Sequence, residues 1–113
     1  NNMANWKNII IKLQVEGLHF WEDCDIEDVD FLAHPHRHIF HITCKKEVTH
    51  DDRDIEIIRL KREVLNFLEK KYGKVCWFGG MSCEMIAKIL LDEFELNYCS
   101  VLEDNENGAE IWK

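Results

Sequence analysis

All six histidines of this 113-residue chain lie between positions 19 and 50. His36 and His38 are two residues apart in an alternating segment, so their imidazoles should project from the same face of a strand. His19 lies just past the end of a preceding strand, and a hairpin pairing would bring it alongside them. Three imidazole nitrogens with an open fourth position are typical of a catalytic or substrate-binding zinc site. A merely solvated histidine-rich strand is the alternative, and the ligands alone do not exclude iron or manganese.

The remaining reactive side chains in this region leave several interpretations open. His34 shares the parity of His36 and His38, so it is a substitute ligand, a supporting group, a proton donor or an exposed loop residue. His41 faces the opposite side of the strand. Cys24 lies in the loop between the metal candidates, where a thiolate near a metal would be a nucleophile and where an ordinary buried thiol is the alternative.

A histidine and a carboxylate also stand side by side further along the chain. His50 precedes Asp51, and such a pair suits acid–base chemistry. A cluster of acids at the start of a helix is the alternative, because Asp52 and Asp54 follow at once. Cys24, His50 and Asp51 are therefore the candidate catalytic residues.

The composition excludes several classes of function. Acidic residues outnumber basic ones 22 to 14, for a formal charge of −8, and no basic and aromatic stripe suits a phosphate backbone, so we expect no direct nucleic-acid partner. The longest apolar stretches are far below the roughly 20 residues of a membrane span. Five cysteines without a CxxC pair, together with an amino terminus that is not signal-like, predict a cytoplasmic protein without a disulfide framework.

Six elements should position these residues in a single domain spanning residues 1–113. We expect strands at 8–17 and 36–48, helices ending at 72 and 94, and strands at 97–103 and 109–112. Residues 20–34 should form a loop with a short helix at 26–32. The fold class is α+β, with a four-stranded antiparallel sheet and two helices on one face. The exposed face and edges of so small a sheet predict a homo-oligomer.

Five stretches in this order resemble the tunnelling-fold (T-fold) family of 6-pyruvoyltetrahydropterin synthase and 6-carboxytetrahydropterin synthase, the latter of queuosine biosynthesis. They begin with a glycine and histidine after the first strand and an HxH motif followed by an aromatic residue. They continue with a helix beginning near a DFxxLK-like stretch, a second helix start with serine and glutamate, and a late glutamate. In this chain they are Gly17–His19, His36–Phe40, Glu56–Lys61, Ser82–Ala87 and Glu103–Ile111.

The resemblance implies a site and an assembly. His19, His36 and His38 would bind Zn²⁺, which polarises oxygens of a substrate side chain, and Glu103 would hold the amino and oxo edge of a pterin or purine-like small molecule. Ser82 and Cys83 would lie beside the heterocycle. The family's subunits assemble into a β-barrel with sites between subunits, so the resemblance implies a homo-oligomer of that kind.

The sequence departs from the family at its catalytic groups. Leu32 stands where the family has a catalytic cysteine, and Leu68–Lys70 stand where it has an Asp–His pair. Two functions are therefore expected: a zinc-dependent lyase or synthase that uses Cys24, His34 or His50 instead, or a protein that binds, senses or sequesters a nucleobase-like ligand without turnover.

Overall fold

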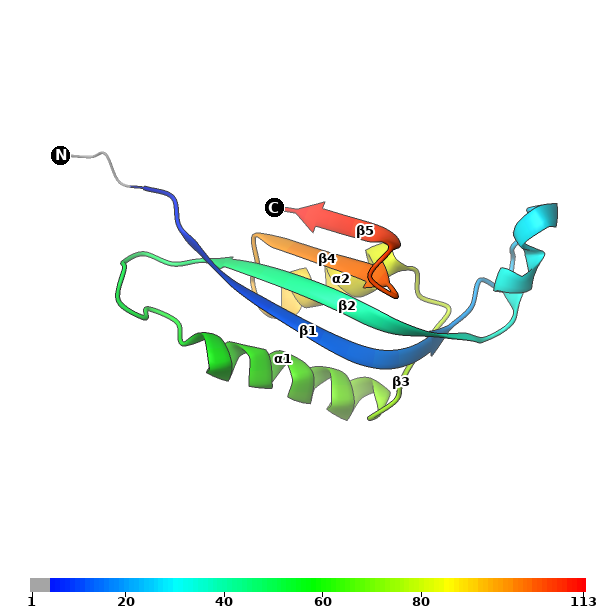
Figure 1. Cartoon of the computed structure of the whole chain (residues 1–113), viewed down its shortest axis with the longest axis horizontal. Coiled ribbons are helices and arrows are strands. Elements are labelled where there is room, and N and C mark those ends of the chain that lie inside the picture. Colours follow the sequence, from blue (N-terminus) through cyan, green and yellow to red (C-terminus); the bar gives the residue numbers. More distant parts are fainter. Residues whose placement is uncertain (1–4) are drawn as a thin grey trace.

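The structure is a computed structural model that describes residues 5–113. Its elements follow in the order β1 (Asn8–His19), η1 (Glu27–Ala33), β2 (His36–Glu47), α1 (Ile57–Tyr72), β3 (Cys76–Gly79), α2 (Cys83–Glu93), β4 (Tyr98–Glu103) and β5 (Asn107–Trp112). Figure 1 shows β1 and β2 as one long twisted hairpin that runs the length of the molecule. The α+β class and the two helices between two strand pairs are as the sequence predicts.

The sheet differs from the predicted four-stranded antiparallel one. It has five strands in the order β3-β1-β2-β4-β5, because the short strand β3 pairs in parallel with the end of β1. The alternation of buried Cys76 and Phe78 with exposed Trp77 is the strand signal in this segment. The sheet is mixed and open in a single chain, with β3 and β5 at its edges, and is not a closed barrel.

One face of the sheet carries the hydrophobic core. Ile11 and Leu13 of β1, Phe40 and Ile42 of β2 and Val101 of β4 are almost fully buried on that face. They form a single cluster with residues of both helices: Leu60, Val64, Leu68, Ile86 and Leu90. Because His36 and His38 share the parity of Phe40 and Ile42 along β2, the histidines lie on the helix-covered face, at the end of the core.

The two helices begin at different kinds of capping residue. The Ser82 hydroxyl accepts a hydrogen bond from the Met85 amide at the start of α2, as predicted. At α1 the cap is Glu56, whose carboxylate accepts from the amides of Ile58 and Arg59. The expectation that Asp51, Asp52 and Asp54 serve this helix end is therefore wrong, since Asp51 pairs with Lys7 and Asp54 accepts from Thr49.

Residues 20–35 form an arm between β1 and β2. Figure 1 shows it standing apart from the sheet, with the short helix η1 at its tip. This 3₁₀-helix buries none of its residues, and it confirms the predicted short helix. The two ends of the arm are joined by a hydrogen bond from the Trp21 amide to the Leu32 carbonyl. Among residues 5–113, no helix is long and apolar enough to span a membrane.

Gly108 is needed in β5, where it pairs with Leu102 of β4, because a Cβ there would lie 1.9 Å from the Val101 carbonyl oxygen. We expect Gly108→Ala to lower the free energy of unfolding by about 2 kcal/mol, the scale of overpacking strain. Urea unfolding measures this change. Gly80→Ala is the matched control, because a Cβ at Gly80 meets nothing within 4 Å. Equal stability of the two variants would contradict the steric argument.

Candidate metal centre

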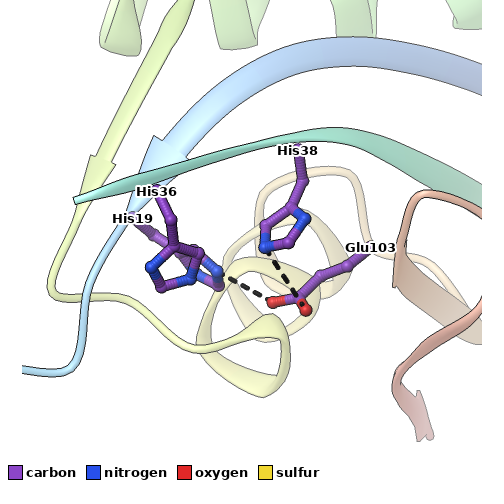
Figure 2. A group of neighbouring side chains, drawn as sticks. All are labelled: His19, His36, His38 and Glu103. Carbon is purple, nitrogen blue, oxygen red and sulfur yellow. Dashed lines mark ion pairs between the residues drawn. The ribbon is translucent and has the colours of Figure 1, made fainter. Parts of the chain in front are cut away.

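Three strands bring four polar side chains together at one end of the sheet. His19 is the last residue of β1 and pairs with His36, the first residue of β2. Glu103 is the last residue of β4 and pairs with Phe40, two residues beyond His38. Figure 2 shows the three imidazoles and the carboxylate pointing toward one another. The strand pairing that the sequence predicts therefore places the three histidines as expected.

The potential ligand atoms of this group all lie within 4.8 Å of one another. The Nε2 atom of His19 is 2.8 Å from one oxygen of Glu103, and the Nε2 atom of His38 is 3.5 Å from the other. Because zinc lies about 2 Å from its nitrogen and oxygen ligands, two ligands of one ion lie at most about 4 Å apart. The atom pairs at 2.8 and 3.5 Å satisfy this limit, and a pair as far apart as 4.8 Å needs a small movement of a side chain to meet on one ion. The donor set of three imidazoles and a carboxylate also suits zinc.

The other ring nitrogen of each histidine is held by an oxygen outside the cluster. The Nδ1 atom of His19 lies 2.9 Å from the Met81 carbonyl, and that of His36 lies 2.9 Å from the His34 carbonyl. The Nδ1 atom of His38 lies 2.7 Å from the Asp104 carboxylate. Such outer partners orient metal-binding histidines and fix their tautomer.

In the neutral form of each ring, these contacts leave the inner nitrogen without a proton. Carbonyl and carboxylate oxygens only accept hydrogen bonds, so we assign the proton of each neutral ring to Nδ1, which leaves a lone pair on Nε2. Nε2 of His19 and Nε2 of His38 are buried and make no hydrogen bond. Lone pairs that face the Glu103 carboxylate repel it unless a cation lies between them. The cluster therefore fits a bound metal ion.

A proton is a poorer candidate for that cation. His19 is only 7% exposed, and burial lowers its pKa, an effect that the hydrogen bond to Met81 and the charge of Glu103 oppose. The charged imidazolium form is thus disfavoured where the carboxylate approaches most closely. A neutral imidazole is the form that binds a metal.

Asp104 supports His38, although no motif in the sequence indicates this role. Its carboxylate accepts from His38 through one oxygen and from the Ile39 amide through the other. The hydrogen bond from His38 is the main reason that the pKa of Asp104 lies below its ordinary value. Its position directly after a strand and before an Asn-Glu-Asn-Gly turn is the only sequence signal, and that signal indicates a turn rather than a ligand.

Replacing Asp104 with asparagine should weaken zinc binding about tenfold, the lower end of the range for outer partners of metal-binding histidines. Asparagine tolerates the left-handed backbone at this position, where φ is 54°, and it still accepts from His38 but without the charge. A competition titration with a zinc chelator measures the affinity. Asn105→Asp, at the next left-handed position of the turn, is the control, and an equal loss there would contradict the role of Asp104.

A cavity of about 470 Å³ opens directly beside the histidines, and its lining includes His19, His36 and Glu103. The arm contributes Trp21 and Leu32, and the start of α2 contributes Ser82, Cys83 and Met85. A cavity of this size and mixed lining is typical of a small-molecule site. The three residues expected to hold a heterocycle, Ser82, Cys83 and Glu103, therefore all reach it.

The Cys83 thiol is not a nucleophile in this setting. Burial, together with the charge of Glu103, raises its pKa to about 12. The protonated thiol lies 3.8 Å from a Glu103 oxygen and donates to it. Cys83 is thus suited to holding the carboxylate in place and not to covalent chemistry.

The three candidate catalytic residues lie away from the cavity. Cys24 lies in the arm, its thiol directed at the Val29 carbonyl, and it does not line the cavity. His50 and Asp51 follow the far end of β2, which is 12 residues long, so roughly 35 Å of strand separates them from His36. His50 faces Asp54, not Asp51, at 3.6 Å. The structure does not bring these three residues to the histidines within one chain.

The remaining two histidines have separate positions. His34 is exposed, and its backbone carbonyl, not its imidazole, supports His36. His41 lies on β2 with the opposite parity to His36 and His38, facing away from the cluster.

Comparison with known proteins adds no family to this description. A scan against models of protein families gives no match, and a search of curated proteins finds no relative.

Proposed function

We propose that this chain is a zinc-dependent T-fold protein of the pterin synthase type. It binds a pterin or purine-like heterocycle in the cavity and acts as a lyase or synthase on its side chain. The observation that carries the zinc site is the pair of buried, unpartnered Nε2 atoms of His19 and His38. Bound zinc supplies a Lewis acid for an oxygen of the ligand.

The residues of the cavity support the heterocycle. The Glu103 carboxylate can accept two parallel N–H bonds from a 2-amino-4-oxo ring, as the family resemblance implies. Trp21, Leu32 and Met85 provide apolar surface for a planar ring. Ser82 and Cys83 lie at the N-terminal end of α2 and line the same cavity.

The charge of the arm favours a ligand without phosphate. Residues 20–35 contain no lysine or arginine and six acids, namely Glu22, Asp23, Asp25, Glu27, Asp28 and Asp30. Trp21 and Leu32 place the ends of this arm at the cavity. We expect unphosphorylated dihydroneopterin to bind about tenfold more tightly than its triphosphate at low salt, with the difference shrinking at high salt. Isothermal titration at two salt concentrations measures it, and tighter binding of the triphosphate would contradict this expectation.

The open sheet supports a homo-oligomer. Its edges β3 and β5 and its uncovered face favour closure against further copies, and the resemblance implies a barrel with sites between subunits. In such an assembly, a neighbouring copy is a further source of an acid or base for the cavity, besides Glu84 of the chain's own lining.

A second function is favoured by one observation. Cys24, His50 and Asp51 lie away from the cavity within one chain, and the apolar Leu32 lines it instead. A protein that binds or sequesters the heterocycle without turnover needs only the metal and the residues that line the cavity.

Two measurements test the proposal. Untagged protein should retain one zinc per chain, whereas substoichiometric zinc that mild dialysis removes would overturn it. The zinc-loaded protein should bind pterin but not adenine, which lacks the 2-amino-4-oxo edge, and equal affinity would overturn the ligand assignment. Incubation with dihydroneopterin and its triphosphate then separates the two functions: product formation indicates the enzyme, and binding without product indicates the binding protein.

A further inference from the structure

We propose that Glu103 is a fourth ligand of the metal, which closes the site at rest and which an incoming ligand must displace. This inference rests on the proposed metal centre and deepens it. The family resemblance gives Glu103 a different role, that of holding a heterocycle. The two roles make different predictions for metal binding in the absence of any heterocycle.

The carboxylate of Glu103 is aimed at the histidines. One oxygen lies 2.8 Å from Nε2 of His19 and the other 3.5 Å from Nε2 of His38, as Figure 2 shows. These are the two nitrogen atoms that carry lone pairs and no hydrogen bond. A carboxylate and two lone pairs converging on one point are the donor set of a cation and not of a hydrogen-bonded network.

The local backbone holds Glu103 in this direction. It is the last residue of β4, paired with Phe40, so its side chain shares the face of His38. The left-handed residues Asp104 and Asn105 then turn the chain sharply. The two consecutive carboxylates therefore have different contacts: Glu103 lies inside the cluster, and Asp104 accepts a hydrogen bond from the outer nitrogen of His38.

No basic side chain in the described part of the chain compensates the charge of Glu103. Within residues 5–113, the only basic side chains within 4.0 Å of its oxygens are His19 and His38, at 2.8 and 3.5 Å, and its other partner is the neutral thiol of Cys83. Neutral imidazoles cannot balance a carboxylate whose side chain is only 29% exposed. A bound divalent cation balances it directly.

Glu103 also lines the cavity, together with His19 and His36, so the metal position borders the cavity. With Glu103 as the fourth ligand, a molecule that enters from the cavity finds no open position on the metal and binds it only by displacing a protein ligand. Structural zinc sites use four protein ligands, whereas catalytic sites keep a position open. Displacement of Glu103 would convert the first arrangement into the second and would free the carboxylate to hold the entering molecule.

The test is Co²⁺ binding by the wild-type chain and by Glu103→Gln, with no heterocycle present. Glutamine keeps the size of the side chain and can still accept from Cys83. We expect Glu103→Gln to bind Co²⁺ at least about tenfold more weakly, because the loss of a direct ligand should cost at least as much affinity as the loss of a residue that supports a ligand. We also expect its visible absorption spectrum to differ from that of the wild type. Glu106→Gln removes a charge from the exposed turn nearby and should change neither. Circular dichroism establishes that the variants fold.

Imidazole provides a second readout of the same inference. Because it must displace the carboxylate in the wild-type protein, it should perturb the Co²⁺ spectrum of Glu103→Gln at about tenfold lower concentration. Equal Co²⁺ affinity, spectrum and imidazole response in wild type and Glu103→Gln would overturn Glu103 as a ligand while leaving the three-histidine centre intact. Failure of the wild-type chain to bind Co²⁺ or Zn²⁺ would instead overturn the metal centre itself.

Discussion

Replacing His19, His36 or His38 with alanine should weaken zinc binding by more than about 100-fold in each case. Structural zinc sites have binding free energies of about 10–16 kcal/mol, or about 3 kcal/mol for each of four ligands. A loss of that size corresponds to a factor of about 150 in affinity. Each of the three side chains has its outer nitrogen held by an oxygen, so the site is built in advance around all three.

His41→Ala is the matched control for this prediction. His41 lies on the same strand as His36 and His38 but with the opposite parity, so its removal should leave zinc affinity unchanged. Competition with a chromophoric chelator measures all four variants. If one of the three histidine variants retained wild-type zinc affinity, the histidine replaced in it would not be a ligand.

Zinc should also stabilise the folded chain by about 4 kcal/mol when its free concentration is about 1,000 times the dissociation constant. The ligands come from β1 and β2, and in the proposed closed site from β4 as well, segments that only the folded sheet brings together. The unfolded chain therefore binds zinc weakly, and the binding free energy adds to the stability. Thermal denaturation should show a rise of roughly 15 °C for a domain of this size.

The same titration on His38→Ala gives the control for stability. At the same free zinc concentration, a loss of affinity of about 150-fold leaves only about 1 kcal/mol of stabilisation, so the melting temperature of His38→Ala should rise by no more than about 5 °C, while that of His41→Ala should rise as the wild type does. A rise of equal size in His38→Ala would place the stabilising ion elsewhere on this acidic surface.

The histidine group could be predicted from the sequence because the positions of its members depend on short-range geometry. The two-residue spacing of His36 and His38 requires a common face in any strand, and the hairpin pairing puts His19 opposite His36. The position of Glu103 in the cluster was harder to predict. It depends on the register of β4 against β2, which is set by packing of residues far apart in the chain.

Other features lay beyond the sequence for related reasons. Strand β3 is only four residues long, and its pairing with β1 is parallel and non-local. The outer contacts of the histidines come largely from backbone carbonyls, at His34 and Met81, which have no residue-type signal. The suggested pair of His50 and Asp51 is wrong because other partners occupy those side chains: Asp54, four residues along the chain, faces His50, and the distant Lys7 pairs with Asp51.

X-ray absorption spectroscopy of the zinc-loaded wild-type protein tests the three-histidine centre most directly. We expect a single shell of nitrogen and oxygen ligands at about 2.0–2.1 Å, with the outer scattering of three imidazole rings and no sulfur. A sulfur shell at about 2.3 Å would contradict it, because the ion would then be held by a cysteine such as Cys83 rather than by His19, His36 and His38.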